Sequence, residues 1–128
     1  MGPASKTDAL FIDTWEDSKH GVNYFRITLV GEEVELDYHC LFDADEDDWT
    51  NVSVRVPQDQ FLEQLRAALA TGGSHIEVPG ATIQGSRAGM TREDNGAVRF
   101  DIHSGIDGAY HSVPRADVER MLAALEAA

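Results

Sequence analysis

The chain has 128 residues, of which 42% are hydrophobic, and a formal net charge of −13. This length suits one domain, and the hydrophobic fraction is too high for wholesale disorder. The negative charge disfavours nucleic acid and anionic membranes as partners and favours basic proteins. The single cysteine, Cys40, excludes an intrachain disulfide and fits a cytoplasmic location. Since no apolar run approaches the about 18 residues of a membrane helix, we expect no membrane span.

Strands are predicted directly after a short tail at residues 1–8. Aromatic and β-branched residues predict strands at 9–15 and 22–30. The clearest strand is 33–42, where apolar and polar residues alternate strictly, as expected when one face is buried. Its buried face comprises Val34, Leu36, Tyr38, Cys40 and Phe42.

A fourth strand, ending at Val56, and a helix opening at Pro57 complete the first half. Proline is tolerated in the first turn of a helix, and Gly72-Gly73 is a typical stop signal. The apolar stripe between them has helical spacing and consists of Phe61, Leu65 and Leu69.

The second half is predicted to repeat this pattern. Its expected elements are strands at 75–78 and 81–85, a polar loop at Gly89–Gly96, a strand at 97–103, a turn at Gly105–Gly108 and a strand at Ala109–Val113. Val113-Pro114 then opens a final helix. The inward face of that helix comprises Val118, Met121, Leu122 and Leu125.

Both halves therefore read as four strands closed by Val-Pro and an amphipathic helix. We predict one α+β domain at 9–128, with an antiparallel sheet, two helices and the order ββββα repeated twice, at about 9–72 and 73–128.

Three short segments, one at the junction of the halves and two in the second half, carry a family resemblance. They are Thr71-Gly72-Gly73 before the strand at His75–Val78, Gly96-Ala97-Val98, and Val113-Pro114-Arg115 before the last helix. With the repeated layout, they resemble the PUR and Whirly single-strand-binding proteins and the SsgA-like cell-division regulators. The resemblance implies a related fold. The acidic first half departs from the basic faces of PUR and Whirly proteins, which leaves a protein-recruiting role open.

The most specialised feature is a window without lysine or arginine between Arg26 and Arg55. It holds nine acids: Glu32, Glu33, Glu35, Asp37, Asp43, Asp45, Glu46, Asp47 and Asp48. The polar face of strand 33–42 is then an acidic stripe, and the segment 43–48 an acidic loop. Carboxylates on one strand face recur every ~6.7 Å, about half the linear charge density of a DNA strand. Stripe and loop must therefore act together to imitate phosphates, and the alternative is a solvated face that only aids solubility.

Metal and cofactor sites are not expected. The segment from Asp43 to Asp47 resembles the opening of a calcium loop, but Asp48 stands where glycine is needed and Val54 where glutamate is needed. Glycines at 80, 85 and 89 fit no nucleotide-binding pattern.

One enzymatic alternative rests on Asp101, His103 and His111. Asp101 and His103 share a predicted strand face, and His111 would join them if the neighbouring strands pair suitably. Exposed polar residues on a solvated sheet explain the same pattern, so we predict no enzyme.

A modest basic patch is formed by Arg87, Arg92 and Arg99 around Gly89–Gly96. Because no aromatic residue interleaves the arginines, the sequence does not favour a nucleic-acid platform. The patch would also allow a homodimer in which it meets the acidic face of a second copy.

The sequence thus favours a non-enzymatic inhibitor or binding module, of the immunity, anti-CRISPR or nucleic-acid-mimic type, that docks on a basic protein. The residues predicted to make the contact are Glu33, Glu35, Asp37, His39, Asp43, Asp45, Asp47, Asp48 and Trp49. The alternative is a recruitment protein that acts through an apolar surface.

Overall fold

A computed structural model of the chain describes residues 8–17, 21–43, 48–71, 76–78, 85–105 and 107–127. Its elements, in order, are β1 (Asp8–Asp17), β2 (Gly21–Val30), β3 (Glu33–Asp43), β4 (Asp48–Pro57), α1 (Gln58–Thr71), β5 (Ile76–Val78), β6 (Ser86–Arg92), β7 (Val98–Ser104), β8 (Asp107–Val113) and α2 (Arg115–Ala127). The α+β class and the ββββα order, repeated twice, are as predicted.

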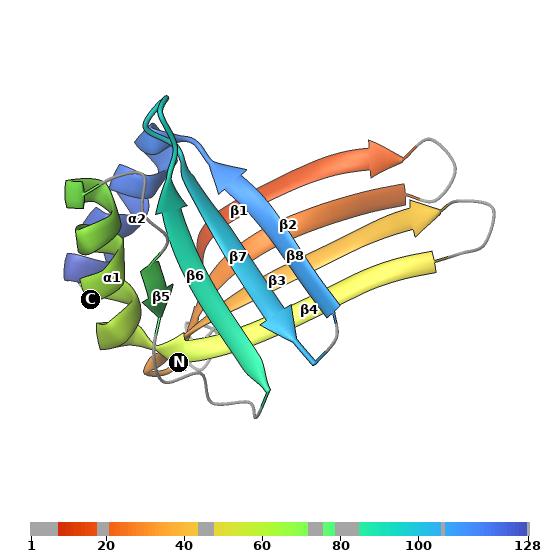
Figure 1. The fold of residues 1–128 in the computed structure, drawn as a ribbon, viewed down its shortest axis with the longest axis horizontal. Helices are drawn as coiled ribbons and strands as arrows, with labels where there is room; N and C mark the ends of the chain where they lie inside the picture. Colours follow the sequence, from red (N-terminus) through yellow and green to blue (C-terminus); the bar gives the residue numbers. More distant parts are fainter. Residues whose placement is uncertain are drawn as a thin grey trace.

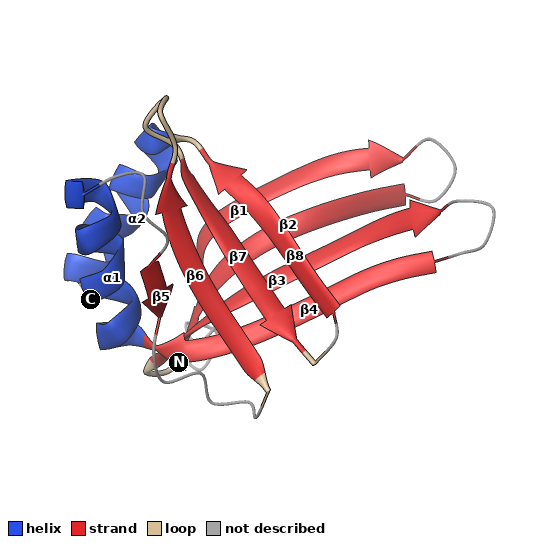
Figure 2. Cartoon of the chain, in the orientation of Figure 1, coloured by secondary structure: helices blue, strands red, loops and turns tan. Residues whose placement is uncertain are grey.

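Each half of the chain forms its own antiparallel meander. The first sheet has the order β1-β2-β3-β4 and the second the order β5-β6-β7-β8. The two sheets face each other with their strands crossing, and the long strands of the first sheet project beyond the second (Figure 1). The helices lie side by side at the opposite end, where they close the space between the sheets (Figure 2).

The core lies between the sheets and under the helices. Val34, Leu36, Val54 and Val56 alternate along β3 and β4 and are almost fully buried, as the period of two predicts. Both helices contribute their predicted apolar positions: Phe61, Leu65, Val118, Met121 and Leu125 are buried. The buried residues of both halves form one cluster.

Helix starts follow the two Val-Pro pairs. Pro57 is the last residue of β4, and α1 begins one residue later, at Gln58. In the second half, the Pro114 carbonyl accepts hydrogen bonds from the backbone N–H groups of Asp117 and Val118. These bonds begin the hydrogen-bond ladder of α2. The prolines therefore mark the boundaries, although neither lies inside its helix.

Two segments of the second half differ from the prediction. Asp107 and Gly108, expected in a turn, are the first residues of β8. Gly89–Arg92, expected in a loop, belongs to β6, and Gly85, expected in a strand, forms the turn before it with a φ of 81°. Ala88 and Met90 of β6 are buried while Arg87 is exposed, so tertiary packing overrides the low strand propensity of the small residues. The rest of the predicted strand 81–85 lies outside the described residues.

Candidate binding surface

The acidic stripe lies on the face of the first sheet that points away from the second sheet. We call this side the outer face. Glu33, Glu35 and Asp37 stand on it, between the buried residues of β3. The strand pairing fixes their neighbours, because residues directly opposite each other in a ladder share a face.

Two arginines stand directly opposite acids of the stripe. Arg26 of β2 pairs with Asp37, and its Nη2 lies 2.9 Å from Asp37 Oδ2. Arg55 of β4 pairs with Glu35, with Nε 3.0 Å from Glu35 Oε2, and its Nη1 lies 3.9 Å from Glu33 Oε1. The hydrogen bond to Asp37 raises the pKa of Arg26, and the hydrogen bond to Glu35 raises that of Arg55.

These are the two arginines that bracket the window without basic residues. Strand pairing places both arginines beside the stripe, so two positive charges offset the three acids there. One pairing could have been found from the sequence, because counting outward from the turn Gly31-Glu32 places Arg26 opposite Asp37. The other could not, because an irregularity between Leu41 and Asp43 shifts the register of β3 against β4.

His39 takes part in an ordered row next to the stripe. Its ring stacks on Tyr24 with the centroids 5.3 Å apart, and its Nδ1 forms a hydrogen bond with Asn51 Oδ1. The Arg26 guanidinium lies 5.1 Å from the Tyr24 ring centroid and joins this row to the ion pairs. These contacts therefore connect the polar side chains of β2, β3 and β4 on the outer face.

Three of the remaining predicted contact residues, Asp43, Asp48 and Trp49, lie at the far end of the first sheet. Trp49 pairs with Leu41, and Asp48 with Asp43, at the ends of β3 and β4. The side chains of Asp43, Asp48 and Trp49 are not among those described, and Asp45 and Asp47 lie outside the described residues. Figure 1 shows that β3 ends, and β4 begins, at the end of the first sheet opposite the helices. We call this the distal end.

The strength of the outer-face ion pairs is measurable. We expect a double-mutant cycle with Arg26→Ala and Asp37→Ala to give a coupling of about 0.5 kcal/mol in unfolding free energy, because the side chains are 39% and 20% exposed. The coupling should decline with added salt. The exposed pair Arg115–Glu119 is a matched control with a smaller coupling. Zero coupling of Arg26 and Asp37 at low salt would contradict the neutralisation of the stripe.

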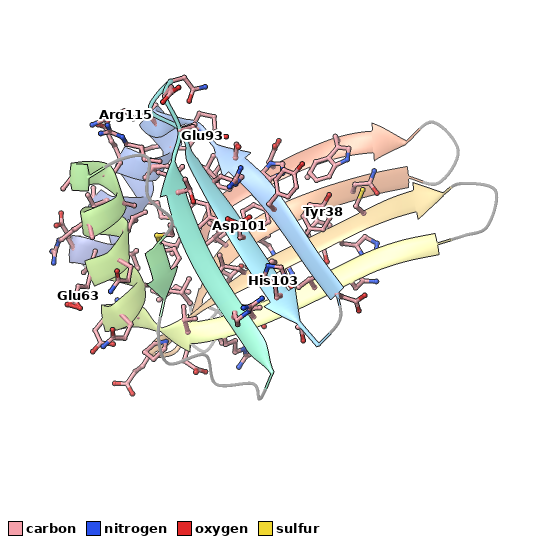
Figure 3. The ribbon with its side chains drawn as sticks, in the orientation of Figure 1. Tyr38, Glu63, Glu93, Asp101, His103 and Arg115 are labelled. Carbon is pink, nitrogen blue, oxygen red and sulfur yellow. The ribbon has the colours of Figure 1, made fainter. Side chains whose placement is uncertain are left out.

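The structure does not bring together the three residues of the enzymatic alternative, Asp101, His103 and His111. Asp101 and His103 lie on the outer side of the second sheet (Figure 3), but Asp101 pairs with Tyr110, so the next residue, His111, points to the opposite face. There its ring stacks on Trp15, with a centroid distance of 5.2 Å, and its Nε2 lies 2.7 Å from Asp13 Oδ2. His111 thus joins the two sheets through Asp13 and Trp15, on the face opposite Asp101 and His103.

The predicted arginine patch is also divided between two faces. Arg87 and Arg99 lie on the outer side of the second sheet. Arg92 instead donates a hydrogen bond to α1, with its Nη1 3.0 Å from the Leu69 carbonyl oxygen. Contrary to the sequence reading, an aromatic residue does stand beside them: Tyr110 is 68% exposed and its ring centroid lies 5.6 Å from the Arg99 guanidinium. The only sequence feature that places Tyr110 on this face is the alternation of side chains along β8.

Among the described residues, no group of three or more His, Cys, Asp or Glu side chains could hold a metal ion. No helix of the described chain has the length and apolar character needed to cross a membrane.

Comparisons with known proteins bear only on the fold. The chain matches no protein-family model and no curated protein. Its structure is similar to the crystal structures of Trypanosoma brucei MRP1/MRP2, with a TM-score of 0.64 and 19% sequence identity, over 97% of this chain and 84% of that one. The resemblance to PUR, Whirly and SsgA-like proteins stays a prediction.

Proposed function

We propose that this chain is a non-enzymatic binding or inhibitor module that docks a basic protein through the distal end of its first sheet. The supporting observation is the position of Arg26 and Arg55. They offset Glu33, Glu35 and Asp37, and neither is opposite a residue of the 43–48 segment. In the sequence, the segment 43–48 adds five acids and no basic residue, so we assign the attraction to it.

This placement changes which predicted residues carry the docking. The stripe, held by its ion pairs, orients the surface, while Asp45, Asp47 and their neighbours supply the attraction. Charged groups of this kind accelerate encounter with an oppositely charged partner and make association sensitive to salt. A recruitment protein that uses an apolar surface would instead bind almost independently of salt.

The test separates local from total charge. An octalysine peptide is the basic probe, and its association is measured at low and high salt for the native chain and two double variants. Asp45→Lys with Asp47→Lys should weaken binding about tenfold at low salt. The control, Glu63→Lys with Asp94→Lys, changes the net charge equally at exposed positions of α1 and the β6–β7 loop, and should weaken binding much less.

Equal weakening by both double variants would show that the probe responds only to net charge. The distal end would then be wrong as the docking site. Binding of the native chain that did not decline with salt would contradict the electrostatic mechanism and favour the apolar alternative.

A further inference from the structure

The outer face of the first sheet contains a groove of about 610 Å³ above Thr28. Its apolar side is formed by Ala9, Ile12 and Val30, and its polar side by Arg26, Glu35 and Arg55. This volume lies in the range of small-molecule binding sites. We call it the Thr28 groove.

A register irregularity in β1 creates the hollow. Ala9 stands opposite Thr28, Leu10 is the extra residue, and the next side chain on the outer face is Ile12, opposite Arg26. Only the methyl group of Ala9 therefore neighbours Thr28 from the edge strand. Ile12, which is 55% exposed, forms an apolar wall beside it.

Two buried polar atoms of residues that line the groove have no hydrogen-bond partner in the described part of the chain. Thr28 is 6% exposed, and its Oγ1 has no hydrogen-bond partner in the described part of the chain. The same holds for the buried Nε of Arg26, whose Nη2 donates to Asp37. A guanidinium Nε–H only donates and a hydroxyl can donate, so both atoms suit one acceptor oxygen.

The charges around the groove decide which acceptor fits. Both arginines are already paired with acids, because Arg26 contacts Asp37 and Arg55 contacts Glu35 and Glu33. A carboxylate ligand would add a fourth negative charge near these acids, whereas a neutral carbonyl supplies the oxygen without a charge. The apolar wall requires an aliphatic group next to that carbonyl.

We infer that the Thr28 groove binds a neutral aliphatic amide, with its carbonyl oxygen toward Thr28 and Arg26 and its alkyl group against Ile12. A small amide and a leucine-like residue in a polypeptide share this chemistry. The groove shares Arg26, Glu35 and Arg55 with the stripe. Thr28, Ala9 and Ile12 are uncharged and belong to neither the stripe nor the 43–48 segment, so variants at these positions test the groove separately from docking at the distal end.

The probe is N-acetyl-leucine methylamide, titrated into the intact protein while backbone amide NMR shifts are followed. We expect a Kd of about 1 mM, as ligand size allows, with shift changes centred on Thr28 and Ile12. Hexanoate should bind at least fivefold more weakly. A capped Gly-Leu-Gly peptide that binds more tightly than the single residue identifies a polypeptide as the occupant, and equal or weaker binding identifies a small amide.

Two variants and one control test the groove itself. Thr28→Val removes the hydroxyl at nearly constant volume and should weaken probe binding at least fivefold without lowering the resistance of the protein to urea. Ala9→Leu fills the hollow from the exposed edge strand and should abolish binding. Thr14→Val, an exposed residue of β1 on the same face, should change nothing.

Native-like binding by both Thr28→Val and Ala9→Leu would overturn the site, as would an absence of shift changes with the native chain. Hexanoate binding as tightly as the amide would overturn the choice of a neutral ligand. Should Thr28→Val fail to fold, Ala9→Leu still decides, because Ala9 is exposed.

Discussion

Replacing Phe100 by alanine should lower the free energy of unfolding by about 4 kcal/mol. Phe100 of β7 is fully buried, and its ring centroid lies 6.2 Å from that of Phe25 in β2 and 6.0 Å from that of Phe61 in α1. One ring therefore contacts the first sheet and a helix from within the second sheet. Its removal leaves a cavity that no single element can fill by moving.

Urea denaturation measures this effect, with the midpoint and slope both fitted. Tyr110→Ala is the matched control, because it removes an aromatic ring of the neighbouring strand that is 68% exposed. We expect the control to cost less than about 1 kcal/mol, chiefly its contact with Arg99. A loss below about 1 kcal/mol for Phe100→Ala would contradict a shared core.

Alkaline pH should destabilise the protein through Tyr38. Burial raises the pKa of Tyr38 to about 12, and the neighbouring Cys40 thiol contributes to the rise. In the unfolded chain the same hydroxyl ionises near pH 10. The unfolded state therefore loses its proton first, and the stability contributed by neutral Tyr38 is lost as pH rises from about 10 to 12.

The size of this effect has an upper bound. A shift of about two pKa units corresponds to about 2.7 kcal/mol, and partial exposure of Tyr38 reduces this to about 1–2 kcal/mol. The measurement is the free energy of unfolding against pH for the native chain and for Tyr38→Phe. The decline above pH 10 should be shallower in the variant, and identical curves would show that Tyr38 is not the group responsible.

The sequence predicted the elements whose side chains separate cleanly by polarity. Strand 33–42 was found because Val34 and Leu36 face the core while Glu33 and Glu35 do not. β6 was misplaced because Ala88, Gly89 and Met90 are all buried and show no such alternation. Whether a strand is buried on both faces depends on its contacts with elements that are distant in the sequence. A local sequence pattern does not contain this information.

The same limit applies to the candidate sites. The acids of the stripe were visible in the sequence, but Arg55 reaches Glu35 only through the register of β3 and β4. The Thr28 groove depends on the irregularity at Leu10, which no residue type signals. Charge composition was thus predictable, whereas the neighbours that offset the charge and the hollow beside it required the pairing of strands.

The single buried cluster also has a consequence for synthesis of the chain on the ribosome. The inner face of the first sheet presents Phe25, Ile27 and Leu36, which are covered partly by elements that begin only at Ser86 and end at Ala127. Until those elements have been made, the nascent first sheet exposes an apolar surface. An exposed apolar surface of this kind favours chaperone binding or premature association, and the excess of acids in residues 1–64, fifteen against four lysines and arginines, opposes association by mutual repulsion.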